Sequence, residues 1–181
     1  MKVLKTTLDG CLIINPAVYK DERGFFCETF HEQRFKETTG ISTSFVQDNQ
    51  SQSSFGVLRG LHYQIGDYAQ AKLVRVIQGK VLDIVVDLRR ESATFGEHFS
   101  IELDAESMTQ LYVPRGFAHG FVTLSEQSIF AYKCDNYYHK DAEQGIRFDD
   151  ATLGLDWHLK ANQLVVSNKD LELPDFKNAK Y

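Results

Sequence analysis

A lysine at the head of an apolar strand pattern is the first residue of this sequence that suggests chemistry. Lys72 leads into the run Leu73-Val74-Arg75-Val76-Ile77, and buried lysines are rare unless they are paired or functional. A cation fixed in a pocket of low dielectric can stabilise a developing oxyanion. His62 and His119 add imidazoles, and Arg59 lies close to His62. Singly, each has an ordinary structural explanation, as a hydrogen-bonded core histidine or a surface arginine. Together they indicate a polar site.

Two segments that hold these residues resemble the paired motifs of cupins, which are small jelly-roll barrels. They are residues 60–64 (GLHYQ), followed by Lys72, and residues 114–119 (PRGFAH). Metal-binding cupins carry two histidines and a glutamate in the first motif and a third histidine in the second. Here Gln64 replaces the second histidine and Lys72 lies near the glutamate position. A protonated lysine has no lone pair for a metal, and two neutral histidines alone hold zinc or iron poorly. We therefore expect no metal, and a metal-dependent cupin such as a dioxygenase is the alternative.

Short apolar or alternating runs predict the strands that must position these residues. Residues 73–77 and 81–88 flank Gln78-Gly79-Lys80, which we interpret as a hairpin. Further runs, separated by polar turns at intervals of roughly 8–12 residues, are typical of a sandwich or barrel. They cover residues 99–103, 110–113, 120–124 and 129–133. The sequence predicts an all-β fold, a cupin-like jelly-roll β-sandwich or barrel with a few short helices.

One helix is predicted from Phe30 to Thr39. Thr29 and Glu32 fit a capping box, and Gly40 fits a C-terminal stop. The stretch from about Asn162 has weak periodicity and is expected to be loop with a short helix. Because no repeat, linker or low-complexity tract interrupts the chain, we expect residues 1–181 to form a single domain.

Composition excludes several classes of protein. The chain has 43% hydrophobic residues and a net charge of −5 without a basic block, so neither disorder nor nucleic-acid binding is expected. Cys11, Cys27 and Cys134 form no close pair, which favours a reducing compartment. No signal peptide and no run of about 20 apolar residues is present. We expect a cytoplasmic protein without a membrane partner.

A longer set of motifs resembles the dTDP-4-dehydrorhamnose 3,5-epimerase family, in the order found in that family. The matching residues are 21–26 (DERGFF), 47–49 (QDN), 56–64 (GVLRGLHYQ), 71–76 (AKLVRV), 94–96 (TFG), 114–121 (PRGFAHGF), 132–134 (YKC), 137–138 (YY) with Glu143 just beyond, and 167–170 (SNKD). They span almost the whole chain. Two departures, Ala93 in place of proline and Phe148 in place of tryptophan, fall outside the expected site.

The resemblance implies the reaction. The substrate would be a 4-keto-6-deoxyhexose linked to thymidine diphosphate, whose ketone acidifies the protons on both neighbouring carbons. Epimerisation removes a proton to give an enolate and returns one on the opposite face, so no redox cofactor is needed. The absence of a glycine-rich dinucleotide fingerprint agrees with this expectation.

The resemblance also implies the catalytic residues. His62 would be the base, since an imidazole titrates near neutral pH. It would be paired with Asp170, which would fix its tautomer, although Asp83, a charge inside a strand, is a rival partner. Tyr132 would be the acid, because its phenol is protonated at neutral pH; a packing role is the alternative. Lys72 would hold the enolate oxygen.

The remaining matches are expected to bind substrate. Guanidinium groups suit pyrophosphate, amides and carboxylates can bond sugar and base edges, and an aromatic face can stack on thymine. The residues concerned are Arg23, Glu28, Gln47, Asn49, Arg59, Lys72, His119, Tyr138, Glu143 and Lys169. In the family, Arg23, Glu28 and the stacking aromatic can involve a neighbouring subunit, so a homodimer is expected.

Three further functions stay open at this stage. A relative that epimerises one carbon, or that isomerises the ketone, would carry the same motifs. A non-catalytic sugar-nucleotide binding module is the third, but such a module would be expected to lack His62 or Tyr132, and both are present.

Overall fold

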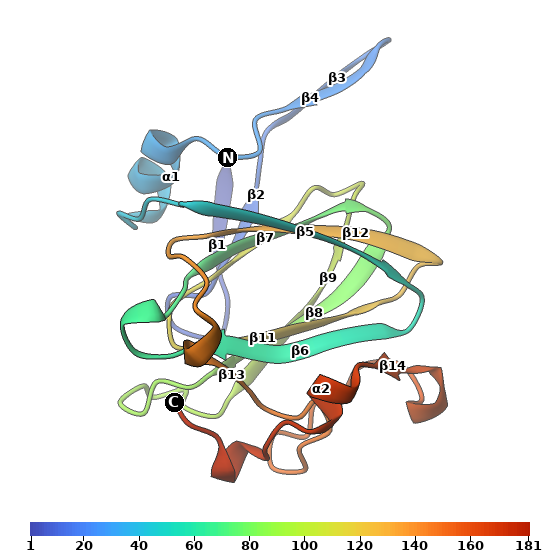
Figure 1. Ribbon diagram of the computed structural model, residues 1–181. Coiled ribbons are helices and arrows are strands. Elements are labelled where there is room, and N and C mark those ends of the chain that lie inside the picture. The colour runs from blue at the N-terminus through green and yellow to red at the C-terminus, as the bar shows by residue number, and fades with distance from the viewer.

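Two antiparallel sheets packed face to face form the body of the protein in the computed structural model, which describes residues 1–181 (Figure 1). The first sheet has the order β1 (Lys2–Lys5), β2 (Leu12–Asn15), β10 (Gln110–Val113), β7 (Lys72–Gln78), β12 (Gln127–Cys134) and β5 (Gln47–Ser54). The second has the order β13 (Glu143–Gly145), β6 (Val57–Gln64), β11 (Phe117–Thr123), β8 (Lys80–Asp87) and β9 (His98–Asp104), with β14 (Val165–Val166) parallel to β6. This arrangement confirms the expected β-sandwich.

The main core lies between the sheets. Val74 and Phe130 of the first sheet pack against Val85 and Phe121 of the second, and all four are buried. The rings of Phe121 and Phe130 stack with centroids 4.1 Å apart. Apolar residues at alternate positions face this interior, as expected for strands with one face on the core.

The C-terminal part of the chain covers the outer face of the second sheet. Leu82, Ile84 and Val86 of β8 point outward against this cover, which includes Trp157. Strand β8 is therefore buried on both faces, and this explains its almost continuous apolar sequence. The covering segment contains the short helix α2 (Asn168–Leu171) and the 3₁₀ turns Ala161–Gln163 and Phe176–Asn178, in agreement with the expected loop and short helix.

The predicted hairpin at Gly79 is wrong. Strands β7 and β8 follow one another in sequence but belong to different sheets, and β7 pairs with β10 and β12 instead. Gly79 has a φ of +76°, and a Cβ there would lie 2.1 Å from the carbonyl oxygen of Gln127. The turn therefore passes the chain from one sheet to the other close to the main chain of a third strand. A sequence pattern of two apolar strands around a glycine does not distinguish these two connections.

The N-terminal helix begins two residues later than predicted. Helix α1 (Glu32–Thr39) is capped by His31, whose Nδ1 accepts the amide N–H of Arg34, so the expected capping box at Thr29 is not formed. Gly40 does end the helix, with a φ of +74°. Phe35 packs this helix against the first sheet. The other 3₁₀ turns are Gly66–Tyr68 and Lys140–Ala142.

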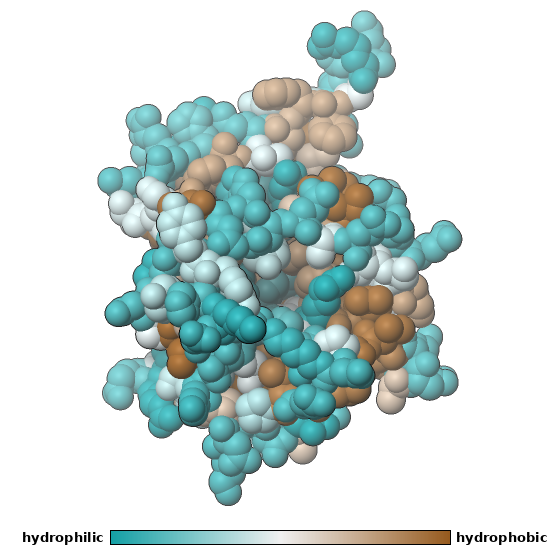
Figure 2. Space-filling model, in the orientation of Figure 1, coloured by the Kyte–Doolittle hydropathy of each residue, from teal (hydrophilic) through white to brown (hydrophobic).

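A two-stranded hairpin stands away from the body. Its strands are β3 (Val18–Asp21) and β4 (Gly24–Cys27), and it projects at the top of Figure 1. Figure 2 shows its tip as a hydrophilic knob clear of the rest of the molecule. None of the helices is long and apolar enough to cross a membrane.

Candidate active site

A cavity of about 660 Å³ lies between the two sheets and brings together most of the residues selected from the sequence. Its walls come from β5, β7 and β12 on one side and β6 and β11 on the other, and the C-terminal segment closes one end. The volume is in the range of small-molecule sites. The selected residues that line it are Asn49, Arg59, His62, Lys72, His119, Tyr132, Tyr138, Glu143, Lys169 and Asp170.

The His62 imidazole is hydrogen-bonded to Asp170. Nε2 of His62, on β6, lies 2.7 Å from Oδ1 of Asp170, on α2. Burial raises the pKa of Asp170, but the hydrogen bond and charge of His62 and the bonds from Gly60 and Ser167 outweigh it, so the pKa lies below its usual range. An ionised Asp170 accepts the proton on Nε2. Nδ1 of His62 then carries the lone pair that can accept a proton from a ligand.

Asp83, the rival partner for His62, is hydrogen-bonded to a second histidine, His119. Its Oδ2 lies 2.8 Å from Nε2 of His119, and both side chains are almost fully buried. Asp83 shares the inward face of β8 with Val81 and Val85. His119 is the cross-strand partner of His62 on β11. Two histidine–aspartate pairs therefore face one cavity, and Asp170 is the residue that contacts His62.

Lys72 is buried at the start of β7 without a carboxylate in salt-bridge contact. Its Nζ lies 3.5 Å from the carbonyl oxygen of His62 and 5.8 Å from the centre of the Tyr132 ring. Burial lowers the pKa of Lys72, and the more distant charges of Cys134, Asp83 and Glu143 offset only part of that effect. An ammonium in this position attracts negative charge that develops on a ligand.

Tyr132 presents a free hydroxyl to the cavity. The residue lies on β12 between Asn49 of β5 and Val74 of β7, and its hydroxyl makes no hydrogen bond within the protein. Burial raises its pKa to about 12, so the phenol is protonated at neutral pH. The hydroxyl is therefore available to a ligand as a donor.

A polar cluster forms the mouth of the cavity. Oε2 of Glu143 accepts the Tyr138 hydroxyl at 2.9 Å and Nζ of Lys169 at 2.6 Å. Burial raises the pKa of Glu143, but the hydrogen bonds from Lys169 and Tyr138 outweigh this effect, so the pKa lies below its usual range. The Tyr138 ring is about half exposed. Arg59 lies on β6, the strand next to the one that carries Glu143, and its guanidinium donates to Ser53 Oγ and to the Gln52 carbonyl of β5 in the other sheet.

Comparison with known proteins identifies the family to which this chain belongs. Residues 5–178 match the family model described as dTDP-4-dehydrorhamnose 3,5-epimerase. A protein of that name from Shigella flexneri is 47% identical over 181 residues, which cover 100% of this chain and 99% of the relative. The chain belongs to the dTDP-4-dehydrorhamnose 3,5-epimerase family.

Solved structures agree with this assignment. The dTDP-4-dehydrorhamnose 3,5-epimerase from Elizabethkingia anophelis superposes with a TM-score of 0.96 at 52% identity, covering 100% of this chain and 99% of that one. A dTDP-6-deoxy-D-glucose-3,5-epimerase from Legionella pneumophila, in complex with dTDP-4-keto-L-rhamnose, gives 0.94 at 45% identity, covering 98% and 93%. The resemblance predicted from the sequence is confirmed.

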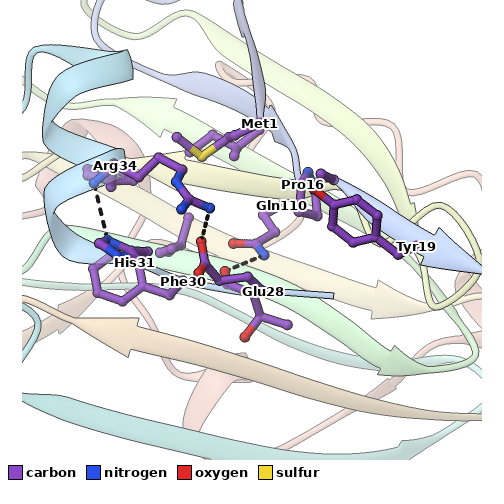
Figure 3. A pocket seen from close by; sticks show the side chains of 13 residues that line it. Met1, Pro16, Tyr19, Glu28, Phe30, His31, Arg34 and Gln110 are labelled. Atoms are coloured by element: carbon purple, nitrogen blue, oxygen red, sulfur yellow. Dashed lines mark hydrogen bonds and ion pairs between the residues drawn. The ribbon is translucent and has the colours of Figure 1, made fainter. Parts of the chain in front are cut away.

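Two of the selected epimerase residues lie away from the cavity. Arg23 is at the tip of the β3–β4 hairpin, where it bonds Asp21 and is strongly exposed. Glu28 lies in a small separate pocket beside α1, where its carboxylate contacts Arg34 at 2.5 Å (Figure 3). Neither side chain lines the cavity of its own chain.

Gln47 supports the cavity of this epimerase-family protein without lining it. Its Oε1 accepts the amide N–H of Tyr138 at 2.9 Å, and its Nε2 donates to Asn49 Oδ1 at 3.1 Å. Both polar atoms of its side-chain amide are therefore engaged within the protein, by two residues that do line the cavity.

Several residues that line the cavity were not selected from the sequence. They include Gln50, Ser51, Gln64 and Gln70. The sequence could have identified Gln64 as a lining residue, because it lies two positions after His62 on one strand and so faces the same side. Gln50 and Ser51 lie in a polar strand that the apolar pattern missed. No group of three His, Cys, Asp or Glu side chains is arranged to hold a metal ion.

Proposed function

We propose that this protein epimerises dTDP-4-dehydro-6-deoxy-D-glucose at carbons 3 and 5 to dTDP-4-dehydro-L-rhamnose. The observation that carries the proposal is the convergence of the His62–Asp170 pair, the Lys72 ammonium and the free Tyr132 hydroxyl on one cavity. These groups supply a base, an oxyanion partner and an acid. Membership of the epimerase family supports the substrate and the reaction.

Proton abstraction is assigned to His62. A proton on a carbon next to the ketone moves to the imidazole, and the electron pair of the broken C–H bond delocalises onto the ketone oxygen as an enolate. Asp170 stabilises the imidazolium that forms, because its carboxylate accepts the other ring N–H. Lys72 holds the enolate oxygen, and the negative charge on that oxygen favours the protonated lysine.

Reprotonation on the opposite face is assigned to Tyr132. Its hydroxyl has no partner in the protein and is protonated at neutral pH, as its raised pKa implies. Donation of that proton to carbon collapses the enolate to the ketone with inverted configuration. The tyrosinate left behind must regain a proton, and the histidinium must lose one, before the next turnover. Atoms and charge then balance with no redox change.

The nucleotide end of the substrate is assigned to the mouth. Arg59 and Lys169 supply positive charge for the pyrophosphate, and the half-exposed ring of Tyr138 offers a stacking face for thymine. Asn49 and His119, which line the cavity, and Glu143, which belongs to the polar cluster at the mouth, are assigned to the sugar and the base edges.

A homodimer completes this site. Tyr19, Phe25 and Phe26 on the β3–β4 hairpin are 65%, 62% and 69% exposed, and exposed aromatic residues of this density suit an interface. A second copy would cover these rings and bring the partner's Arg23 and Glu28 to the cavity, as the family resemblance implies. Sedimentation at assay concentrations tests the dimer, and a fully active monomer would contradict it.

Mixing two variants tests the sharing of residues. His62→Ala removes the base of its own cavity, and Arg23→Ala removes a residue donated to the other cavity. If Arg23 acts across the interface, mixed dimers hold one intact site, and mixing two inactive variants restores activity. If Arg23 acts within its own chain, mixing restores nothing.

The product places the enzyme in dTDP-L-rhamnose biosynthesis, which supplies cell-surface polysaccharide such as O antigen. A cytoplasmic location is supported by three cysteines that are all unpaired, two of them buried.

The decisive experiment is incubation with dTDP-4-dehydro-6-deoxy-D-glucose in deuterated water, with His62→Ala as the control. We expect deuterium at carbons 3 and 5 and a product of L-rhamno configuration. Exchange and inversion at one carbon would identify a mono-epimerase, and a shift of the ketone would identify an isomerase. No exchange at either carbon would overturn the proposal.

A further inference from the structure

Gln64 makes two hydrogen bonds to the main chain of one residue at the mouth of the cavity. Its Nε2 donates to the carbonyl oxygen of His139 at 3.1 Å, and its Oε1 accepts the amide N–H of His139 at 2.9 Å. The side chain is 7% exposed. Both polar atoms of the amide are thus engaged by a single backbone unit that directly follows Tyr138.

A second glutamine holds the neighbouring peptide. Oε1 of Gln47, on β5, accepts the amide N–H of Tyr138 at 2.9 Å. Gln64 is on β6, so the two amides reach the Tyr138–His139 segment from different sheets. This segment lies between β12 and the 3₁₀ turn at Lys140–Ala142 and has no strand partner of its own. Side chains therefore supply the main-chain bonds that a sheet would otherwise supply.

The ring of Tyr138 has little else to hold it. It is 51% exposed, and its only side-chain hydrogen bond goes to Glu143. An exposed ring on an irregular segment can adopt several orientations, and ordering it on binding costs free energy. Fixing the main chain on either side of the ring removes part of that cost before the ligand arrives.

We propose that Gln64 is a positioning residue for nucleotide binding, which acts through Tyr138 and leaves the proton-transfer groups unaffected. The inference rests on the proposed function, because it takes Tyr138 as the stacking face for thymine. Gln64 makes no hydrogen bond to His62, Lys72 or Tyr132, so loss of its amide weakens the hold on the nucleotide without altering the base, the oxyanion partner or the acid. The glutamine that replaces a cupin metal ligand in the sequence thus has a recognition role.

The test measures the dissociation constant for dTDP by calorimetry and kcat and KM for the dTDP-4-keto-sugar. Gln64→Leu keeps the approximate size of the side chain and removes both bonds. Gln64→Glu keeps the acceptor for the His139 N–H but turns an oxygen toward the His139 carbonyl. Each is expected to raise Kd and KM on the order of 10-fold, the worth of one to two neutral hydrogen bonds, with kcat within about 2-fold.

A double variant tests whether Gln64 acts through Tyr138. Tyr138→Ala alone should raise Kd on the order of 10-fold or more, the usual effect of removing a stacked ring. Adding Gln64→Leu to it should change Kd by less than about 2-fold, because the ring that Gln64 positions is already gone. Losses that multiply would overturn the proposal, and so would an unchanged Kd in the single variants.

Stability and function are separated by a matched control. Ser128→Ala removes a buried 2.8 Å hydrogen bond to Thr123 outside the cavity lining, and it should lower the unfolding temperature without changing Kd. If Gln64→Leu does not fold, Gln64→Glu carries the same comparison. The inference alone is contradicted if the parent binds dTDP, Tyr138→Ala binds it less well, and the Gln64 variants bind it as tightly as the parent. A parent that binds no dTDP contradicts the proposed function.

Discussion

Arg59 and His62 lie three positions apart on β6, yet both side chains line the same cavity. Regular alternation would send them to opposite faces of the sheet. The register between β6 and β11 shifts in this region, and Gly60 lies at the irregularity with a φ of +118°. Such a local bulge re-aims the side chains around it. The Arg-Gly-Leu-His sequence thus turns a phosphate-binding candidate and a base candidate toward one cavity.

Gly60→Ala is expected to unfold or inactivate the protein. An added Cβ would lie 2.7 Å from Gly120 Cα and 2.7 Å from the His119 carbonyl oxygen, which are main-chain atoms that cannot move aside easily. We expect a loss of more than about 2 kcal/mol in the free energy of unfolding, measured by urea titration. Gly66→Ala is the control: it also has positive φ, but nothing lies within 4 Å, so it should cost only about 1 kcal/mol. Equal costs would show that the close approach at Gly60 is unimportant.

The two histidine–aspartate pairs should differ in kinetic effect. Asp170→Asn removes the carboxylate that stabilises imidazolium at His62, so kcat and solvent exchange should fall by about 10²–10⁴. Asp83→Asn disturbs His119, which is assigned to binding, so KM should rise while exchange at saturating substrate stays within about 10-fold. Steady-state kinetics and deuterium exchange check both. The reverse pattern would assign the base to His119.

Lys72→Met should separate stability from activity. Burial lowers the pKa of Lys72, which means that the folded state disfavours its charge. The resulting cost is complete below the folded-state pKa and fades as pH rises toward the ordinary value of 10.5. The variant should therefore be as stable as the parent or more stable, with any advantage larger at pH 7 than at pH 9.5. Its kcat should fall by about 10²–10³, because the enolate loses its cation. Retained activity would remove Lys72 from the mechanism.

The lowered pKa of Asp87, a residue that does not line the cavity, predicts that the stability of the protein depends on pH. Burial raises its pKa, but hydrogen bonds from Arg89, Ser92 and Thr94 lower it to about 2. A lowered folded-state pKa contributes stability above the unfolded value of 3.8 and loses it as pH falls toward 2. The difference in unfolding free energy between parent and Asp87→Asn should therefore shrink by about 1 kcal/mol from pH 5 to pH 3. A constant difference would show that Asp87 is not ionised in this network.

The fold class could be predicted because most strands carry apolar residues at alternate or successive positions. Strand β5 (Gln47–Ser54) escaped because it is a polar edge strand, so its pairing with β12 leaves no hydrophobic signature. The turn at Gly79 was misassigned because sequence distance does not tell which sheet a strand joins. The Thr94-Phe95-Gly96 motif has a structural role here, since the Thr94 hydroxyl bonds Asp87.

Most residues that line the candidate site could be selected from the sequence, but Arg23, Glu28 and Gln47 do not line it. The contacts between the selected residues were only partly expected. His62, Lys72 and Tyr132 were selected by type and by resemblance, and all line one cavity. The choice between Asp83 and Asp170 depended on which histidine each carboxylate contacts. Asp83 lies on β8 and contacts His119, whereas Asp170 lies on α2 of the covering C-terminal segment and contacts His62, and only the folded chain defines these contacts. Gln64 was noticed only as a missing metal ligand, because its hydrogen bonds go to main chain 75 residues away.

Tyr132→Phe should uncouple proton exchange from inversion. His62, Lys72 and the ketone are untouched, so the enolate still forms and deuterium still enters from solvent. Reprotonation then comes mainly from His62 on the original face, which gives exchange with retained configuration. Formation of the epimer should fall by about 10²–10⁴. Thermal unfolding should hardly change, because the hydroxyl has no hydrogen-bond partner to leave unsatisfied. Products followed by NMR in deuterated water, with His62→Ala as the variant that loses both processes, separate the two steps. If Tyr132→Phe inverts as fast as the parent, Tyr132 is a packing residue and the donor must be sought at Tyr138, Tyr63 or a bound water.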